Sequence, residues 1–394
     1  MIHKKSGISV LGILVIIMVA GNLRAPITAV GPILSEIKTV LSLNTSEASL
    51  LTSIPLAVFA FCSIMISRIA GKGNIRHSLI YTCVALVLGL AMRVYGNVTM
   101  LYIGSIVMGL GICIGNVTTP AYIKQAFPNH IGLMTGIFSV SMNLIAAMAS
   151  GLSLSIGQWT GLGWKGSLGV WTFWSVLALL VVLLDSFMAS PVQRATRTKR
   201  VDSIRIFRSN QAWNISFFMG GQSLVYYCLV ALLPVVLVDY GMPKEETGMV
   251  LFTIQMAMLP VMFIAPVIAS KMKDQKVLIY AVGILMFSGV GMLILCKRTF
   301  IYTTAILMGG ASGLAFSLAI LFFSLKSKTM EGTIKISGMA QSVGYLIAAI
   351  GPPIFGLLYE RDPSWQSSFY FLLVTITLMV YFGAKAARQR FIED

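Results

Sequence analysis

Long apolar stretches separated by short polar segments repeat along the whole chain, and each stretch is about as long as a membrane-spanning helix. Roughly 20 mostly apolar residues cross the hydrocarbon core of a bilayer as an α-helix. Lipid offers no hydrogen-bonding partners to peptide groups, so each stretch is predicted to be helical. The pattern predicts twelve spans, at 8–34, 48–68, 76–95, 99–124, 132–157, 165–188, 211–238, 245–269, 277–296, 300–325, 333–358 and 365–386.

The composition agrees with this pattern and excludes a soluble enzyme. Hydrophobic residues make up 57% and charged residues 11% of the 394 residues, whereas soluble domains carry roughly 25% charged residues. The mean hydropathy of +0.87 is too high for burial in one core, so we expect an all-α membrane protein. The five cysteines show no metal or disulfide spacing, and there is no phosphate-binding loop, so no cofactor or metal is expected.

Basic residues are distributed unevenly between the two sides of the predicted spans. Lys and Arg concentrate in cytoplasmic segments of membrane proteins. If both termini are cytoplasmic, 21 of the 29 basic residues lie on that side, so we expect this orientation. The net charge of +16 is spread between spans rather than gathered on one patch, which argues against a nucleic-acid partner.

The chain is predicted to consist of two related halves. At an offset of 202 residues, TGIFSVSMNLIAA at 135–147 aligns with SGMAQSVGYLIAA at 337–349, and the two segments share the run LIAA. Such self-similarity is the signature of an internal repeat. The predicted parts are an N-terminal six-helix bundle at 1–188, a basic cytoplasmic linker at 189–210 and a C-terminal six-helix bundle at 211–394.

Arg24 stands near the middle of the first predicted span, where a charge is costly. Arginine stays charged even when it is buried, and no Asp or Glu occupies the central part of any span. We hypothesise that Arg24 binds an anion, because a guanidinium matches the geometry of a carboxylate-like group. The alternative is a structural arginine that donates to backbone carbonyls near proline-containing kinks.

Amide and hydroxyl side chains inside the spans complete the predicted site. Asn and Gln are absent from the central portions of the third, sixth, ninth and twelfth spans, so we expect those spans to face lipid and the others to line a cavity. The amides can alternatively hold helices together, and tyrosines can serve packing. The predicted substrate-binding residues are Asn22, Arg24, Thr28, Asn116, Gln222, Tyr226, Tyr227, Gln341 and Tyr345.

Four longer motifs carry a family resemblance. They are NLRAPITAVGPIL at 22–34, GNVTTPAYIKQAFP at 115–128, SLVYYCLVALLP at 223–234 and SGMAQSVGYLIAAIGPP at 337–353. The chain resembles the major facilitator superfamily, in the branch of bacterial cyanate transporters and 2-nitroimidazole exporters. The resemblance implies two pseudo-symmetric six-helix bundles, a central site between them, alternating access, and a monomer in the bacterial inner membrane.

The loop after the second predicted span departs from the family pattern. SRIAGKGNIRH at 67–77 keeps the glycine and basic residues of the superfamily's signature loop but lacks its acidic residue. The resemblance implies that Arg68, Lys72 and Arg76 are gating-loop residues, whose contacts then cannot follow the usual Asp-based scheme. Arg93, at the outer end of the third span, also matches the pattern.

The predicted function is secondary active or facilitative transport of a small anion or weakly acidic solute, such as cyanate or a small organic anion. Arg24 is then the anion-binding residue, and the partners are this solute and membrane lipid. One alternative is export of neutral nitro-heterocycles or drugs, with Arg24 in a structural role. Another is a membrane sensor that transports nothing. No span has an Asp, Glu or His at its centre, so protons are expected to move with the substrate or to bind at a site that it completes; the alternative is a carboxylate at a span edge, such as Glu36, Glu47 or Asp239.

Overall fold

The computed structural model describes residues 9–43, 45–70, 74–95, 97–188 and 206–394. Twelve helical segments in this described part are long and apolar enough to cross a membrane, which confirms the predicted number of spans. The chain divides into two compact units, the first ending at residue 203 and the second beginning at residue 204. Most of the predicted linker, 189–205, lies outside the described residues.

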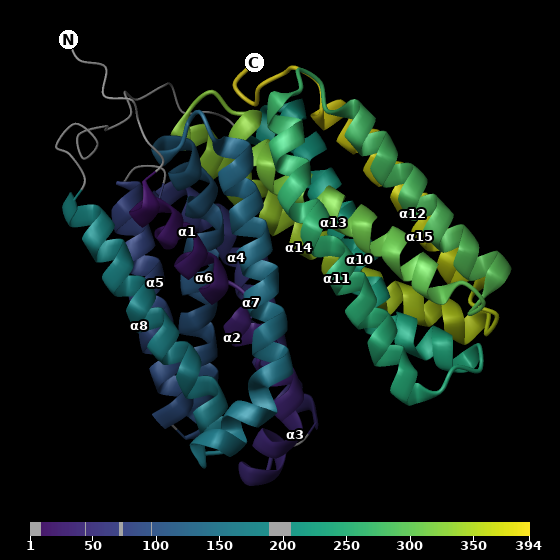
Figure 1. Cartoon of the computed structure of the whole chain (residues 1–394), viewed down its shortest axis with the longest axis horizontal. Coiled ribbons are helices and arrows are strands. Elements are labelled where there is room, and N and C mark those ends of the chain that lie inside the picture. Colours follow the sequence, from purple (N-terminus) through teal and green to yellow (C-terminus); the bar gives the residue numbers. More distant parts are fainter. Residues whose placement is uncertain (1–8, 44, 71–73, 96, 189–205) are drawn as a thin grey trace. The chain divides into compact units, whose positions relative to one another are not determined.

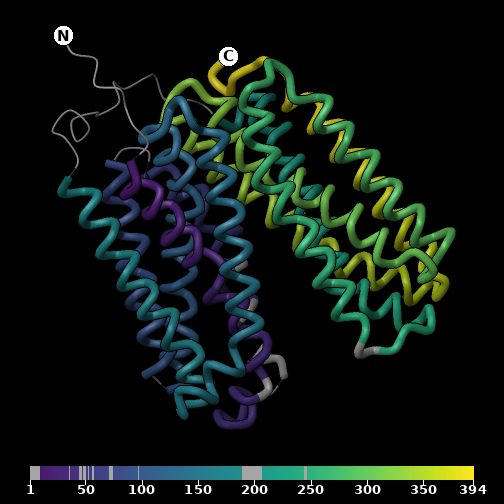
Figure 2. Tube along the Cα trace, viewed as in Figure 1, coloured from purple at the N-terminus to yellow at the C-terminus, as the bar shows by residue number. Residues whose placement is uncertain are grey.

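Each unit is built from helices that run up and down along one another (Figures 1 and 2). The first unit contains α1 Val10–Asn22, α2 Ala25–Thr28, α3 Val30–Val40, α4 Thr45–Ala70, α5 Ile75–Tyr95, α6 Val98–Ala126, α7 Ile131–Thr160 and α8 Trp164–Met188. The second unit contains the 3-10 helix η1 Ile206–Arg208, then α10 Asn210–Asp239, α11 Lys244–Lys271, α12 Lys276–Cys296, α13 Ile301–Leu325, α14 Met330–Arg361 and α15 Gln366–Ala386.

The first span differs from its prediction as one helix over 8–34. It consists of three successive helices, α1, α2 and α3, of which α2 is only four residues long (Figure 1). A helix as short as one turn is not stable by itself, because nucleation costs more than its few hydrogen bonds return. Contacts from the rest of the first unit must therefore hold α2 in place.

Glycines let selected helices approach closely in each unit. In the first unit, a Cβ added to Gly89 of α5 would lie 2.4 Å from the backbone nitrogen of Met108 in α6. In the second unit, a Cβ on Gly309 of α13 would lie 2.4 Å from the carbonyl oxygen of Ile254 in α11. Apolar helices gain no hydrophobic driving force for association in lipid, so close van der Waals packing at small residues helps to hold them together.

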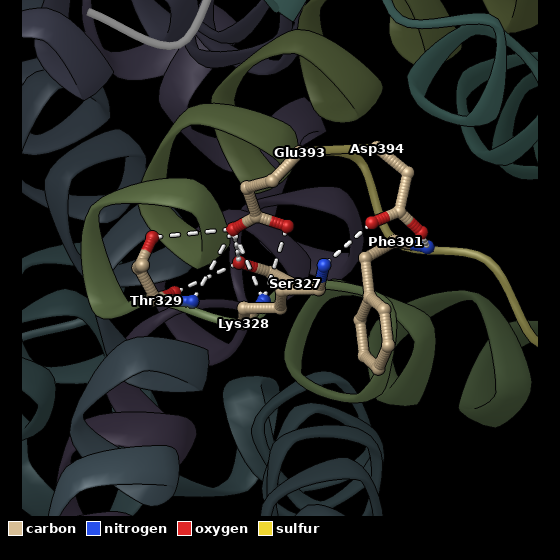
Figure 3. Close-up of polar contacts among 6 residues, drawn as sticks. All are labelled: Ser327, Lys328, Thr329, Phe391, Glu393 and Asp394. Carbon is tan, nitrogen blue, oxygen red and sulfur yellow. Dashed lines mark hydrogen bonds and ion pairs between the residues drawn. The ribbon is translucent and has the colours of Figure 1, made fainter. Parts of the chain in front are cut away.

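The segment after α15 folds back onto the turn between α13 and α14 (Figure 3). The Glu393 carboxylate accepts hydrogen bonds from the backbone N–H groups of Lys328 and Thr329 and from the hydroxyl of Ser327, at 3.0, 3.2 and 2.8 Å. The backbone N–H of Ile392 donates to the Lys326 carbonyl at 2.9 Å. A carboxylate at this position also compensates the unpaired N–H groups at the start of α14.

Candidate functional site

A break in the first span creates the local geometry around Arg24. Helix α1 ends at Asn22, and Arg24 adopts φ −135° and ψ −37°, outside helical values, before the chain turns into α2. Pro26 explains the position of the break, because its ring has no N–H to donate and clashes with the carbonyl four residues earlier. The break therefore leaves main-chain oxygen atoms that a continuous helix would have used.

Side chains and carbonyls of α7 bind the C-terminal end of α2 and the residue that follows it. The Ser153 hydroxyl donates to the Ala29 carbonyl at 2.6 Å, and the Thr28 hydroxyl donates to the Ala146 carbonyl at 2.9 Å. Peptide groups inside a membrane must find partners within the protein, since lipid supplies none. These hydrogen bonds place Thr28, a predicted site residue, at the contact between α2 and α7.

Arg93 binds the same segment from α5. Its Nη1 atom donates to the carbonyl of Pro26 at 3.1 Å and also lies 3.1 Å from the sulfur of Met108. The Arg93 side chain is fully buried. Helix α2 is thus held from two directions, by α7 and by α5.

The Arg24 guanidinium is half-buried and points to α7. Its Nη1 atom donates a short hydrogen bond to Oδ1 of Asn143. The Asn143 Nδ2 group in turn donates to the Ser139 carbonyl at 2.9 Å, which directs the amide oxygen toward Arg24. A guanidinium has five N–H donors in a planar fork, enough to hold an amide oxygen and a carboxylate-like anion together.

Asn22 and Asn116 take different positions in the first unit. Asn22 is fully buried, donates to the Met18 carbonyl at 2.9 Å and accepts a hydrogen bond from Ser175 of α8. This arrangement is typical of an amide that joins two helices in a membrane. Asn116 of α6 is half-buried, and its neighbour Gly115 packs closely against the residue that precedes Arg24.

The two predicted glutamines of the second unit bind locally. Gln222 of α10 donates from Nε2 to the Ser223 hydroxyl at 2.7 Å, and Gln341 of α14 donates from Nε2 to the Ser337 hydroxyl at 2.9 Å. Both side chains are buried. Each of these two hydrogen bonds stays within one helix.

The predicted tyrosines of the second unit are all half-buried. The Tyr226 hydroxyl of α10 donates to Oε1 of Gln255 in α11 at 3.3 Å, and the Tyr226 and Tyr227 rings meet edge to face with centroids 5.6 Å apart. Tyr345 lies on α14, which packs along α10. The substrate-binding role of all nine predicted residues remains a prediction.

The basic residues of the predicted gating loop lie in unlike environments. Arg68 is exposed in the last turn of α4, and Lys72 lies outside the described residues. Arg76, at the start of α5, is buried and forms an ion pair of 2.9 Å with Asp185 of α8, whose carboxylate also accepts from the Tyr122 hydroxyl at 3.1 Å. These three side chains line a cavity of about 240 Å³. Arg76 therefore pairs with an acid of α8, whereas the loop itself contains no acidic residue.

Sequence reasoning missed two partners that the structure reveals. Asn143 lies in the fifth predicted span and is not among the nine predicted site residues, although the repeat at an offset of 202 pairs it with Tyr345, which is. Asp185 lies near the end of the sixth span, where charged residues are common, so nothing in the pattern distinguished it. Among the described residues, no three His, Cys, Asp or Glu side chains gather as metal ligands would.

Comparison with known proteins finds full-length relatives. The sequence profile of the Major Facilitator Superfamily matches residues 10–349. The uncharacterised transporter YycB of Bacillus subtilis is 33% identical, over 96% of this chain and 93% of its own length. The 2-nitroimidazole transporter of Escherichia coli is 31% identical, over 95% of both chains. The cyanate transport protein CynX of Escherichia coli is 23% identical, over 96% of this chain and 98% of its own length.

The fold has a solved counterpart. The fucose:proton symporter FucP of E. coli superposes with a TM-score of 0.76, over 96% of this chain and 99% of that chain. The sequences are 13% identical, so the likeness concerns the fold alone.

Proposed function

Since this chain belongs to the Major Facilitator Superfamily and is a multi-pass membrane transporter of that type, we propose that it carries a small anion or weakly acidic solute and that Arg24 binds it. Cyanate and small organic anions are the solutes that this proposal favours. Transport proceeds by alternating access, either coupled to a gradient or facilitative.

One observation carries this proposal: a half-buried guanidinium stands at a break in a membrane span, and it is directed by a neutral amide. The hydrogen bond from Arg24 to Asn143 orients the cation without cancelling its charge. In a low-dielectric setting, a cation attracts an anion more strongly than it would in water. A half-exposed arginine in such a setting suits reversible binding of a carboxylate-sized or smaller anion.

One of the relatives is named for a solute of this class. CynX is named as a cyanate transport protein, and cyanate is a small monovalent anion. Its similarity extends over nearly the full length of both chains. By this analogy we extend the solute class, but not a particular solute, to the present chain.

A second candidate function is transport of neutral nitro-heterocycles. The 2-nitroimidazole transporter of Escherichia coli favours it, because its 31% identity to this chain is higher than the 23% of the cyanate transport protein. In that case Arg24 serves structure through Asn143, and the charge of the guanidinium is not needed for the solute. The two candidates therefore differ in what substitution of Arg24 does.

The orientation in the membrane is also part of the proposal. The excess of Lys and Arg in alternate connecting segments supports cytoplasmic termini and a location in a bacterial inner membrane. With this orientation, Lys326 and the segment that binds Glu393 face the cytoplasm. A cysteine placed at Asn210 in a cysteine-free background should then react with impermeant maleimide only after the cells are opened.

The experiment is uptake into liposomes that contain the purified protein, with labelled cyanate, benzoate and 2-nitroimidazole tested separately. We expect Arg24→Ala and Arg24→Lys to reduce anion uptake about tenfold or more, because lysine keeps the charge but loses the fork. Lys165→Met is the matched control, since Lys165 is an exposed cation of the same unit. Unchanged anion uptake by folded Arg24→Ala would overturn the proposal. Uptake confined to 2-nitroimidazole and retained by Arg24→Lys would establish the second candidate.

A further inference from the structure

Arg93 is a buried cation that the transport proposal has not used. Its guanidinium lies among α5, α6 and α2, is fully buried, and donates through Nη1 to the Pro26 carbonyl. Its Nε and Nη2 atoms have no hydrogen-bond partner among the described residues. Burying a charge with so few partners lowers stability, so a compensating role for the side chain is expected.

The space around Arg93 is built for an arginine. Gly104 of α6 faces its stem, and a Cβ at that position would come within 2.9 Å of the Arg93 Cγ atom. The same Cβ would come within 2.6 Å of the Gly89 carbonyl oxygen in α5. Close approach of α5 and α6 therefore fixes the stem, and the guanidinium can reach the break in the first span.

Comparison of the two halves shows that the first unit has both this arginine and the break in its first span, whereas the second unit has neither. At the offset of 202 residues, Arg93 corresponds to Leu295 of α12 and Pro26 corresponds to Cys228 of α10. Helix α10 is continuous through Cys228, and Leu295 is 83% exposed. Where the helix keeps its own hydrogen bonds, no donor from the neighbouring helix is needed.

We infer that Arg93 is a positioning residue of the transport site: it holds the Pro26 carbonyl, fixes α2 against α5, and thereby sets the place of Arg24. Pro26 is two residues from Arg24, and α2 is too short to keep its own direction. With α2 held by the hydrogen bond from Arg93 to Pro26, the Arg24 guanidinium binds Asn143 of α7 in one defined geometry. This inference rests on the proposed role of Arg24 in anion binding.

The first arm of the test needs no substrate. Hydrogen–deuterium exchange of residues 23–40 is compared in the wild type, Arg93→Met, Arg93→Lys and Met108→Leu. Arg93→Met removes the donor, Arg93→Lys keeps one donor, and Met108→Leu removes only the sulfur contact. We expect faster exchange of this segment in Arg93→Met, a smaller change in Arg93→Lys, and wild-type exchange in Met108→Leu. Wild-type exchange in folded Arg93→Met would overturn the inference.

The second arm measures cyanate uptake in a double-mutant cycle of Arg93→Met and Arg24→Ala. We expect Arg93→Met to raise KM about tenfold with little change in maximal rate, and Arg93→Lys to restore most of the affinity. In the Arg24→Ala background the same substitutions should have almost no further effect, because Arg93 acts through Arg24. Independent, additive losses would contradict a positioning role.

The two arms separate the inference from the proposed function. If Arg24→Ala transports normally, the anion-binding proposal fails, while the exchange data still decide whether Arg93 holds the break. If Arg93→Met does not fold, Arg93→Lys carries both arms, since lysine retains a charge and a donor. Faster exchange of residues 23–40 in Arg93→Lys than in the wild type would then support the inference, and wild-type exchange in that variant would overturn it.

Discussion

The first spans of the two units come from related sequence but form different structures. In the first unit, three helices follow one another around Arg24, whereas α10 of the second unit is one helix from Asn210 to Asp239. The repeat aligns Pro26 with Cys228. Cys228 can donate its backbone N–H within the helix and Pro26 cannot, so only the first unit is interrupted at this position.

Proline alone does not decide the outcome. Pro234 lies inside α10, and that helix continues through it. The two units differ in the side chains that can donate hydrogen bonds to the carbonyl oxygen atoms left by an interruption. In the first unit, Arg93 and Ser153 donate to these oxygen atoms. Their repeat positions in the second unit hold Leu295 and Phe355, whose side chains have no donor. A break inside a membrane is therefore retained where neighbouring helices provide hydrogen bonds for it.

The closing helices of the two units show a second contrast. Asp185 near the end of α8 binds Arg76 and Tyr122, while its repeat position is Ala387, whose carbonyl accepts from Lys326 Nζ at 2.8 Å. Both units thus anchor the end of their last helix with a buried cation. The first unit uses a carboxylate as acceptor, and the second uses the main-chain oxygen atoms of residues 387 and 388 together with the amide oxygen of Gln275.

The largest effect is expected from Asp185→Ala. Removing the acid leaves Arg76 buried without its counter-charge, and we expect the free energy of unfolding to fall by about 3 kcal/mol or more. The measurement is equilibrium unfolding in detergent micelles. Glu331→Gln is the control, because it breaks an ion pair between neighbouring turns of α14 and should cost less than about 1 kcal/mol. Equal losses for the two variants would show that the contrast between the units has no energetic basis.

The next effect concerns the first spans themselves. Arg24→Tyr gives the first unit the residue that the second carries at the repeat position, and we expect anion uptake to fall about 100-fold. Tyr226→Phe in α10 is its counterpart, and it should keep uptake within about threefold, since the hydrogen bond that it loses to Gln255 is neutral. The measurement is initial uptake into liposomes. A larger loss for Tyr226→Phe would place the essential contact in the second unit.

A smaller loss is expected when the partner of Arg24 is removed. Asn143→Ala takes away the amide that orients the guanidinium, and affinity for the anion should fall about tenfold. Ser139→Ala is the matched control, because Asn143 donates to the backbone oxygen of residue 139 and not to its hydroxyl. Binding is followed by thermal shift with cyanate or benzoate. Equal shifts for both variants would show that Asn143 does not position Arg24.

The smallest effect concerns Lys326, at the end of α13. Burial lowers the pKa of its ammonium to about 8, below the ordinary value of about 10. Between these pH values the unfolded chain binds more protons than the folded protein, so stability should rise with pH. We expect a gain of about 1 kcal/mol from pH 7 to 9 in the wild type relative to Lys326→Met. Parallel pH profiles for the two proteins would contradict this assignment.

The sequence by itself determined the number of spans, the family and the unusual position of Arg24 within a span. Lipid imposes a length and an apolar composition on every span, so hydropathy alone predicts them. A lone arginine in mid-span is visible for the same reason. The internal repeat at an offset of 202 residues is also detectable in the sequence, and it pairs Arg24 with Tyr226.

Only the tertiary structure decided which side chains meet. Arg24 and Asn143 are 119 residues apart in sequence, Arg93 and Pro26 are 67 apart, and Arg76 and Asp185 are 109 apart. Hydropathy predicts that a helix crosses the membrane, but it does not predict the rotation of the helix about its axis or its shift along the neighbouring helices. Close packing at glycines such as Gly89 and Gly104 sets those two quantities, and with them the hydrogen-bond partners at the break.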